Sequence, residues 1–157
     1  MAYFFDSDER SDSEEEERPR LTVSIPRDEF AYFKVRLHEE VLRSQRRSYR
    51  FSVLHMALDD GKSTVCPEWE RLLKANVREY DILCSVRPEE FLIALPETEE
   101  RFAEKVADRL REALVRNGDP KARVSVGIAC FPQDGANAED LLFFAQQDMK
   151  QARELGK

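Results

Sequence analysis

The stretch DILCSVRPEEFLIAL, residues 81–95, predicts a β-hairpin. Mostly apolar runs stand at 81–86 and 90–95, and only Arg87, Pro88 and Glu89 separate them. Such a short connection joins antiparallel neighbours, because parallel strands need a crossover of about a dozen residues or more. Residues 81–95 are therefore expected to supply two adjacent strands of a sheet, which the rest of the chain must cover with further layers.

Helical and strand patterns alternate on both sides of this hairpin. Before it, a helical pattern runs from Arg27 to residues 46–48, an apolar strand covers 51–58, a turn covers 59–62, and a short helix runs from Pro67 towards Glu79. After it, a helix begins at 96–98, a strand covers 123–129, and a last helix runs from 138 or 139 to 155. This order predicts an α+β fold in which helices flank a central, mostly antiparallel sheet.

Residues 1–20 differ in composition from the rest of the chain. Eight acidic residues against two arginines between Asp6 and Arg18 leave a local charge of −6, out of −7 for the whole chain. Such a segment buries too little apolar surface to fold alone, so we expect a disordered acidic tail over 1–20 and one domain over 21–157. The aromatic start, Tyr3-Phe4-Phe5, leaves two roles open: a solubilising arm, or a peptide that folds onto a partner or onto the domain.

Composition argues against several classes of protein. No apolar run approaches the roughly 18 residues of a membrane helix, and the start of the chain lacks the regions of a secretory signal, so we expect a cytoplasmic protein. The three cysteines and two histidines have no zinc-ligand spacing, and His55, within an apolar strand, is assigned no role. A net charge of −7 disfavours a duplex-DNA binder, which needs a basic stripe.

Four short motifs in the second half of the chain follow one another at characteristic intervals. They are REYD at 78–81, FLIALPET at 91–98, VSVGIA at 124–129 and DG at 134–135. In this spacing the chain resembles a GGDEF domain, the diguanylate cyclase family, and the resemblance extends weakly back to Leu21. It implies the nucleotidyl-cyclase-like fold of that family and a connection with cyclic di-GMP.

The hairpin signature of that family is altered here. The resemblance implies that active members read Gly-Gly-Asp/Glu-Glu-Phe, whose glycines let the backbone approach GTP and whose glutamate helps to hold Mg²⁺. In this chain the same positions are Arg87, Pro88, Glu89, Glu90 and Phe91. Proline fixes φ near about −65° and donates no N–H, and arginine adds a bulky side chain. We therefore expect these side chains to block the position where the phosphates of GTP would approach the backbone.

The resemblance implies two further losses. The metal-binding aspartate of the family aligns with Ala57, and Asp59 or Asp60 would displace that carboxylate by about 6 to 7 Å, too far for the octahedral geometry of Mg²⁺. The family segment after this strand, which holds guanine and metal, is replaced by the shorter run 61–67. We therefore expect no Mg²⁺ cofactor and no diguanylate cyclase activity.

The family's inhibitory product site is retained in register. It is an Arg-x-x-Asp motif that precedes the signature, and Arg78 and Asp81 stand in that register with Arg87. Arg116 and Asp119 fit the bare pattern too, so the register carries the assignment. Arginine bonds bidentately to the O6/N7 edge of guanine, and a carboxylate accepts from its N1–H and N2–H₂ groups.

Further arginines are implied by the stacked ligand dimer that such sites usually hold. Arg109 lies where some family members supply an arginine from the same domain. Arg43 lies where others supply one from a neighbouring protomer, and Arg46 and Arg47 are alternatives to it. A solvated helix face is the alternative interpretation of each.

The leading hypothesis is a non-catalytic cyclic di-GMP receptor that uses Arg78, Asp81, Arg109 and Arg43 and relays binding to an unidentified signalling protein. The tail is one candidate for that contact, and a ligand-bridged homodimer is an open alternative for the oligomeric state. The competing hypothesis is a ligand-free interaction scaffold in which Arg78 and Asp81 form only a surface ion pair. A residual cyclase, or a domain that binds GTP without turnover, is the third.

Overall fold

The computed structural model describes residues 28–59, 67–117 and 122–156. The chain divides into a unit of residues 1–32 and a unit of residues 33–157, and the fold below is that of the second unit. The predicted tail and the predicted domain start at residue 21 lie outside the described residues.

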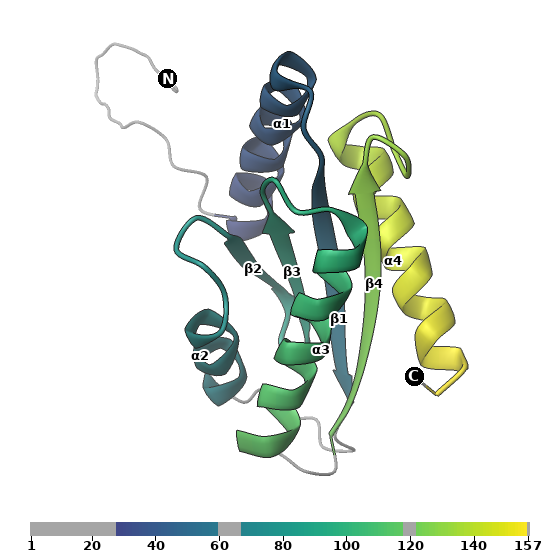
Figure 1. Ribbon diagram of the computed structural model, residues 1–157. Helices are drawn as coiled ribbons and strands as arrows, with labels where there is room; N and C mark the ends of the chain where they lie inside the picture. The colour runs from purple at the N-terminus through teal and green to yellow at the C-terminus, as the bar shows by residue number, and fades with distance from the viewer. Residues whose placement is uncertain (1–27, 60–66, 118–121, 157) are drawn as a thin grey trace. The chain divides into compact units, whose positions relative to one another are not determined.

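The order of helices and strands agrees with the sequence prediction (Figure 1). The elements are α1 (Glu29–Arg47), β1 (Phe51–Asp59), α2 (Pro67–Ala75), β2 (Ile82–Arg87), β3 (Glu90–Leu95), α3 (Glu100–Asn117), β4 (Arg123–Phe131) and α4 (Ala138–Glu154). No helix in the described ranges is long and apolar enough to cross a membrane. The expected cytoplasmic location stays a prediction.

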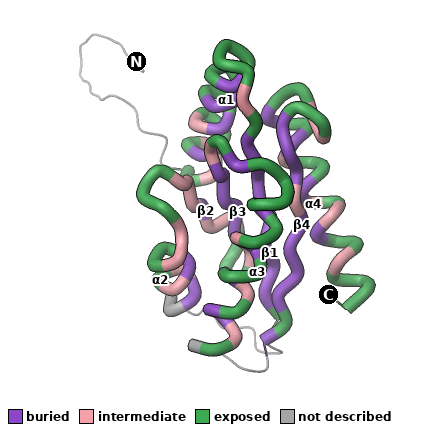
Figure 2. Tube along the Cα trace, in the orientation of Figure 1, coloured by how far each residue is buried: buried purple, intermediate pink, exposed green. Residues whose placement is uncertain are grey.

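The described strands form one antiparallel sheet in the order β2-β3-β1-β4. This confirms the predicted α+β fold. β1 lies in the centre and is buried from Phe51 to Leu58, which Figure 2 shows as a continuous buried segment. Its register places Ala57 between Glu90 of β3 and Ser125 of β4.

Helices cover the two faces of this sheet. On one face, α3 packs on β1 and β4, and α2 packs on α3, with Leu54, Met56 and Leu110 fully buried in the shared core. On the other face, α4 packs on β1 and β4, with α1 beside it (Figure 1). Gly127 of β4 faces α4, and any Cβ at this position would meet the backbone of Ala145 and Met149. This glycine therefore sets how closely α4 approaches the sheet.

Several boundaries differ from the predicted ones; α3, for example, begins at Glu100 rather than at 96–98, and β4 ends at Phe131 rather than at 129. α2 ends at Ala75 rather than near Glu79, because the Asn76 side chain donates to the Leu72 carbonyl at 2.8 Å and the chain then enters a separate turn. The hairpin loop contains only Pro88 and Glu89, because Arg87 still pairs with Glu90 across a bulged register.

Candidate ligand-binding site

The Arg78–Asp81 segment forms a closed turn between α2 and β2. The Oδ2 atom of Asp81 accepts the backbone N–H of Arg78 at 2.8 Å, and the backbone N–H of Asp81 donates to the Arg78 carbonyl at 3.0 Å. Aspartate favours such turns because its short side chain bonds to nearby backbone groups. The carboxylate is only 1% exposed, so the turn places Asp81 behind Arg78.

The guanidinium of Arg78 is held from several sides. Its Nη2 donates to Thr98 Oγ1 at 2.7 Å and to Asp81 Oδ1 at 3.3 Å, and its Nε donates to Asp81 Oδ2 at 3.4 Å. The guanidinium carbon lies 4.5 Å from the centroid of the Tyr80 ring, a cation–π distance. The side chain is nevertheless 42% exposed, so an oriented guanidinium faces solvent.

The burial of Asp81 differs from the expectation that its carboxylate would meet a ligand. Both of its oxygens bond to Arg78, and solvent reaches almost none of it. In this conformation Asp81 orients Arg78, and it could accept from a guanine only after the arginine moved away.

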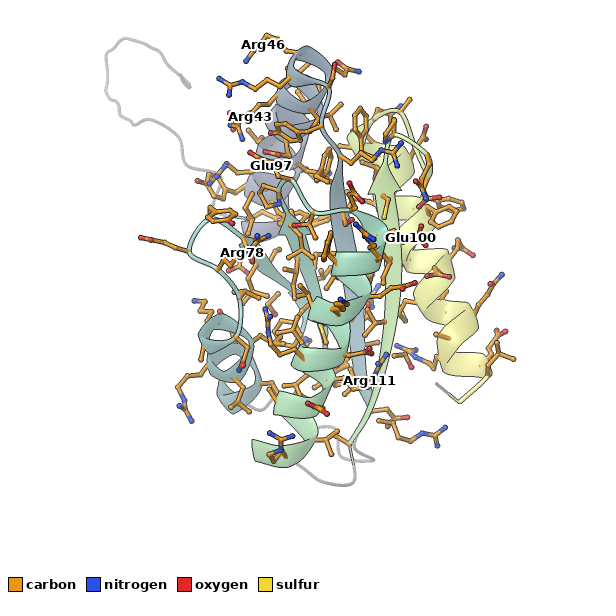
Figure 3. All side chains as sticks on the ribbon, viewed as in Figure 1. Arg43, Arg46, Arg78, Glu97, Glu100 and Arg111 are labelled. Carbon is orange, nitrogen blue, oxygen red and sulfur yellow. The ribbon has the colours of Figure 1, made fainter. Side chains whose placement is uncertain are left out.

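The other arginines expected at the site lie on two helices. Arg109 of α3 donates from Nη2 to the Asn76 carbonyl at 2.9 Å, which brings it to the segment that leads into the Arg78 turn. Arg43 of α1 donates to the buried Glu40 at 2.6 Å, and Arg46 and Arg47 are exposed at the end of the same helix. Figure 3 shows Arg43 and Arg78 on the same side of the unit.

Glu40 is the centre of a small network. It is 2% exposed, and the Tyr49 hydroxyl donates to its Oε2 at 2.8 Å while Arg43 bonds to its Oε1. Burial, and then the bond to Glu40, raise the pKa of Tyr49, so its hydroxyl stays protonated as a donor. The network fixes the direction of the Arg43 guanidinium.

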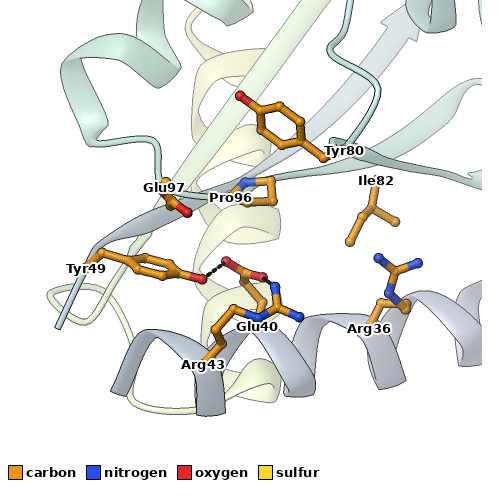
Figure 4. Close-up of a pocket in the computed structure, with 8 residues that line it drawn as sticks. All are labelled: Arg36, Glu40, Arg43, Tyr49, Tyr80, Ile82, Pro96 and Glu97. Atoms are coloured by element: carbon orange, nitrogen blue, oxygen red, sulfur yellow. Dashed lines mark hydrogen bonds and ion pairs between the residues drawn. The ribbon is translucent and has the colours of Figure 1, made fainter. Parts of the chain in front are cut away.

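A cavity of about 320 Å³ connects α1 with the Arg78 turn (Figure 4). It is lined by residues of α1, of the loop after α1, of the Arg78–Asp81 motif, of the start of β2 and of the turn after β3: Arg36, Glu40, Arg43, Tyr49, Tyr80, Ile82, Pro96 and Glu97. Arg43 and Tyr80 therefore share one cavity in a single protomer, whereas the sequence suggested that Arg43 would act on a neighbouring one. Tyr80, Thr98 and Glu97 were not predicted, although Tyr80 stands inside the Arg-x-x-Asp motif.

The altered hairpin lies at the opposite end of β2. Pro88 and Glu89 form its tip, and the Glu89 carbonyl accepts the Leu58 N–H at 2.8 Å. Glu90, which the resemblance aligned with a metal-binding glutamate, is 14% exposed, and its Oε1 lies 3.0 Å from Nε2 of His55. Phe91 is buried in the core.

Glu90 has nitrogen partners at the position that the sequence resemblance predicted for a metal ligand. Besides His55, the side chains of Arg87 and Arg153 each lie 3.9 Å from Glu90 Oε2, and Ala57 opposite offers no oxygen. Among the described residues no group of three or more acidic, histidine or cysteine side chains is placed to hold a metal ion. That the protein binds no Mg²⁺ stays a prediction.

His55 is expected to make stability depend on pH. Burial lowers the pKa of His55 below its ordinary 6.5, outweighing the opposite effect of Glu90, and Arg153 and Lys150 lower it further. As the pH falls below 6.5, His55 is therefore protonated in the unfolded chain before it is protonated in the folded one. The free energy of unfolding that is present above pH 6.5 is lost as the pH falls from 6.5 through the lowered pKa. The midpoint of urea unfolding should fall over this range.

The His55→Gln variant should lose this component of the pH dependence, and a His38→Gln control on the exposed side of α1 should keep it. Equal pH profiles for His55→Gln and the wild type would contradict the lowered pKa.

Comparison with known proteins shows the same assignment for fold and family. The family model for the diguanylate cyclase GGDEF domain matches residues 66–157. The bifunctional diguanylate cyclase/cyclic di-GMP phosphodiesterase MucR of Pseudomonas aeruginosa is 26% identical over 138 residues, which cover 78% of this chain and 20% of MucR. This chain thus spans a small part of that relative.

Solved GGDEF domains have the same fold. That of TpbB (YfiN) from Pseudomonas aeruginosa has a TM-score of 0.73 at 19% identity, covering 81% of this chain and 84% of that one. That of DgcB from Caulobacter crescentus, in complex with c-di-GMP, has a TM-score of 0.70 at 12% identity, covering 81% and 85%. With the family model matching more than half of its length, the chain belongs to the diguanylate cyclase GGDEF-domain family.

Proposed function

We propose that this chain is a non-catalytic receptor for cyclic di-GMP that relays binding to a protein partner. The observation that carries the proposal is Arg78, whose guanidinium is oriented by Asp81, Thr98 and Tyr80 and is still 42% exposed. A guanidinium held in one direction loses little entropy when it bonds bidentately to guanine or phosphate. The family membership and the ligand of the DgcB domain support the choice of cyclic di-GMP.

The residues at and near the β2–β3 hairpin support the part of the proposal that excludes catalysis. Pro88 and Arg87 replace glycines where the family brings its backbone to GTP, and Ala57 replaces a metal-binding aspartate. Glu90, which could still offer oxygens to a metal, already bonds to His55. Restoring metal binding would require this pair to open as well.

Arg109 and Arg43 are the proposed partners of Arg78. Arg109 is bonded to the segment before the Arg78 turn, and Arg43 lines the cavity that Tyr80 also lines. The proposal assigns both to the same protomer as Arg78. A ligand-bridged homodimer remains the alternative assembly.

Titration calorimetry of cyclic di-GMP into the wild type and Arg78→Ala tests the receptor. We expect the wild type to bind more than one ligand per chain. In Arg78→Ala the affinity should fall by about 5- to 150-fold, which corresponds to the free energy of one bidentate hydrogen-bonded pair. Arg101→Ala is the matched control, because that arginine of α3 is 75% exposed and lies beside Glu99 and the Phe102 ring rather than at the Arg78 turn. Its affinity should equal that of the wild type.

The scaffold remains the second candidate, because the closed Arg78–Asp81 pair is also what a structural ion pair looks like. No heat with the wild type at high ligand concentration would favour it and contradict the receptor. Formation of cyclic di-GMP from GTP and Mg²⁺ would instead show a residual cyclase and contradict the proposed loss of catalysis.

A further inference from the structure

Glu97 adopts an unusual backbone conformation at the turn between β3 and α3. Its φ is 53°, and among the described residues only Ser48 shares a positive φ without being glycine. Ser48 directly follows the last residue of α1, where left-handed residues commonly end helices. Glu97 follows Pro96, a turn position that favours glycine, so a glutamate there is strained.

The side chain of Glu97 lines the cavity that Arg43 and Tyr80 also line. Figure 4 shows its carboxylate directed into this space, on the side of the Tyr49 ring. The carboxylate makes no hydrogen bond or ion pair with any residue that the structure describes, whereas Arg43 is bonded to Glu40 and Arg36 to Glu39. A strained residue thus presents an unused acceptor in a cavity whose arginines are already paired.

The size and lining of the cavity indicate which group could occupy it. At about 320 Å³ it lies at the lower end of the range for ligand pockets, about 300 to 1,000 Å³, so it suits one base rather than a whole dinucleotide. The rings of Tyr49 and Tyr80 provide flat surfaces, and the guanidinium groups provide donors. Guanine is the base that offers a carboxylate two adjacent donors, N1–H and N2–H₂, beside an acceptor edge.

We propose that this cavity receives one guanine of the ligand and that Glu97 determines its specificity by accepting from N1–H and N2–H₂. The inference rests on the proposed receptor function. The guanidinium of Arg78 lies over the Tyr80 ring, and Tyr80 also lines the cavity, so the cavity and the Arg78 site share this residue. The strain at Glu97 is then retained because glycine, which would relieve it, has no carboxylate.

Glu97→Gly separates binding from stability, because the two readouts should move in opposite directions. Its melting temperature should rise, since glycine tolerates the left-handed backbone, while its affinity for cyclic di-GMP should fall by about 5- to 150-fold. Glu97→Gln keeps one acceptor and should lose part of the affinity. Glu99→Gln is the matched control in the same turn, where the carboxylate pairs with Arg101, and should bind as the wild type does.

The inosine analogue of the ligand, cyclic di-IMP, tests the assigned contact directly because it lacks the 2-amino group. The wild type should bind it more weakly than cyclic di-GMP, and Glu97→Gly should show little preference. Wild-type affinity in Glu97→Gly, or a lower melting temperature, would overturn the role of Glu97 while the loss in Arg78→Ala still supported the receptor. No binding of cyclic di-GMP to the wild type would overturn the receptor itself.

Discussion

Replacing Gly127 by alanine is expected to lower the free energy of unfolding by about 3 kcal/mol or more, at or above the upper end of overpacking costs. The added Cβ would fall on the Ala145 carbonyl oxygen and the Met149 amide of α4. These are backbone atoms, so no change of rotamer relieves the clash, and α4 must move away from β1 and β4. Urea unfolding followed by circular dichroism measures the loss.

Gly156→Ala is the matched control for that variant. At this position an added Cβ would meet only the Arg123 Nη2 atom, at 3.6 Å, and the penalty comes from the positive φ of 76°. We expect a cost of about 1 kcal/mol, the value for a left-handed non-glycine residue. Equal urea midpoints for Gly127→Ala and the wild type would contradict the close packing of α4 against β4 at this position.

Arg78→Ala is expected to destabilise the fold as well as to weaken ligand binding. Removing the guanidinium leaves the Asp81 carboxylate, which is 1% exposed in the native structure, with the Arg78 backbone N–H as donor, and losing the charged partner of a buried group costs about 1 to 3 kcal/mol. Because Arg78 itself is 42% exposed, solvent screens the pair, and we expect the lower half of that range. Urea midpoints of the single variants measure it.

The double variant Arg78→Ala/Asp81→Ala should lose less stability than the two single variants together, because no buried carboxylate remains without its partner. Strict additivity would mean that the ion pair contributes nothing.

Local patterns predicted most of the fold. The hairpin at 81–95 and the helix–strand alternation follow from periodicity and short connections, and the structure confirms them. The end of α2 was placed too late because the side chains of Asn76 and Asp81 compete for backbone groups that a longer helix would use. Propensity alone does not rank such competing bonds.

The candidate site was predictable only in part. Register with the family suggested Arg78 and Arg109, and Arg109 bonds to the Asn76 carbonyl in the segment before the Arg78 turn; that either binds a ligand stays a prediction. The burial of Asp81, and the contact of Thr98 with Arg78 across 20 residues of sequence, depend on how β3 and α3 meet the turn. Glu97 stands in the motif FLIALPET but was assigned no role, because its positive φ is visible only once the turn is folded.

The central position of β1 has a consequence for the unfolded chain. Residues 51–58 read FSVLHMAL, without proline, glycine or an acidic or basic residue other than histidine, and all of them are buried in the native sheet. Once released, this segment has the composition of strands that aggregate, and its backbone loses hydrogen-bonded neighbours on both sides. Heating therefore favours irreversible association, whereas urea, which solvates such segments, favours reversible unfolding.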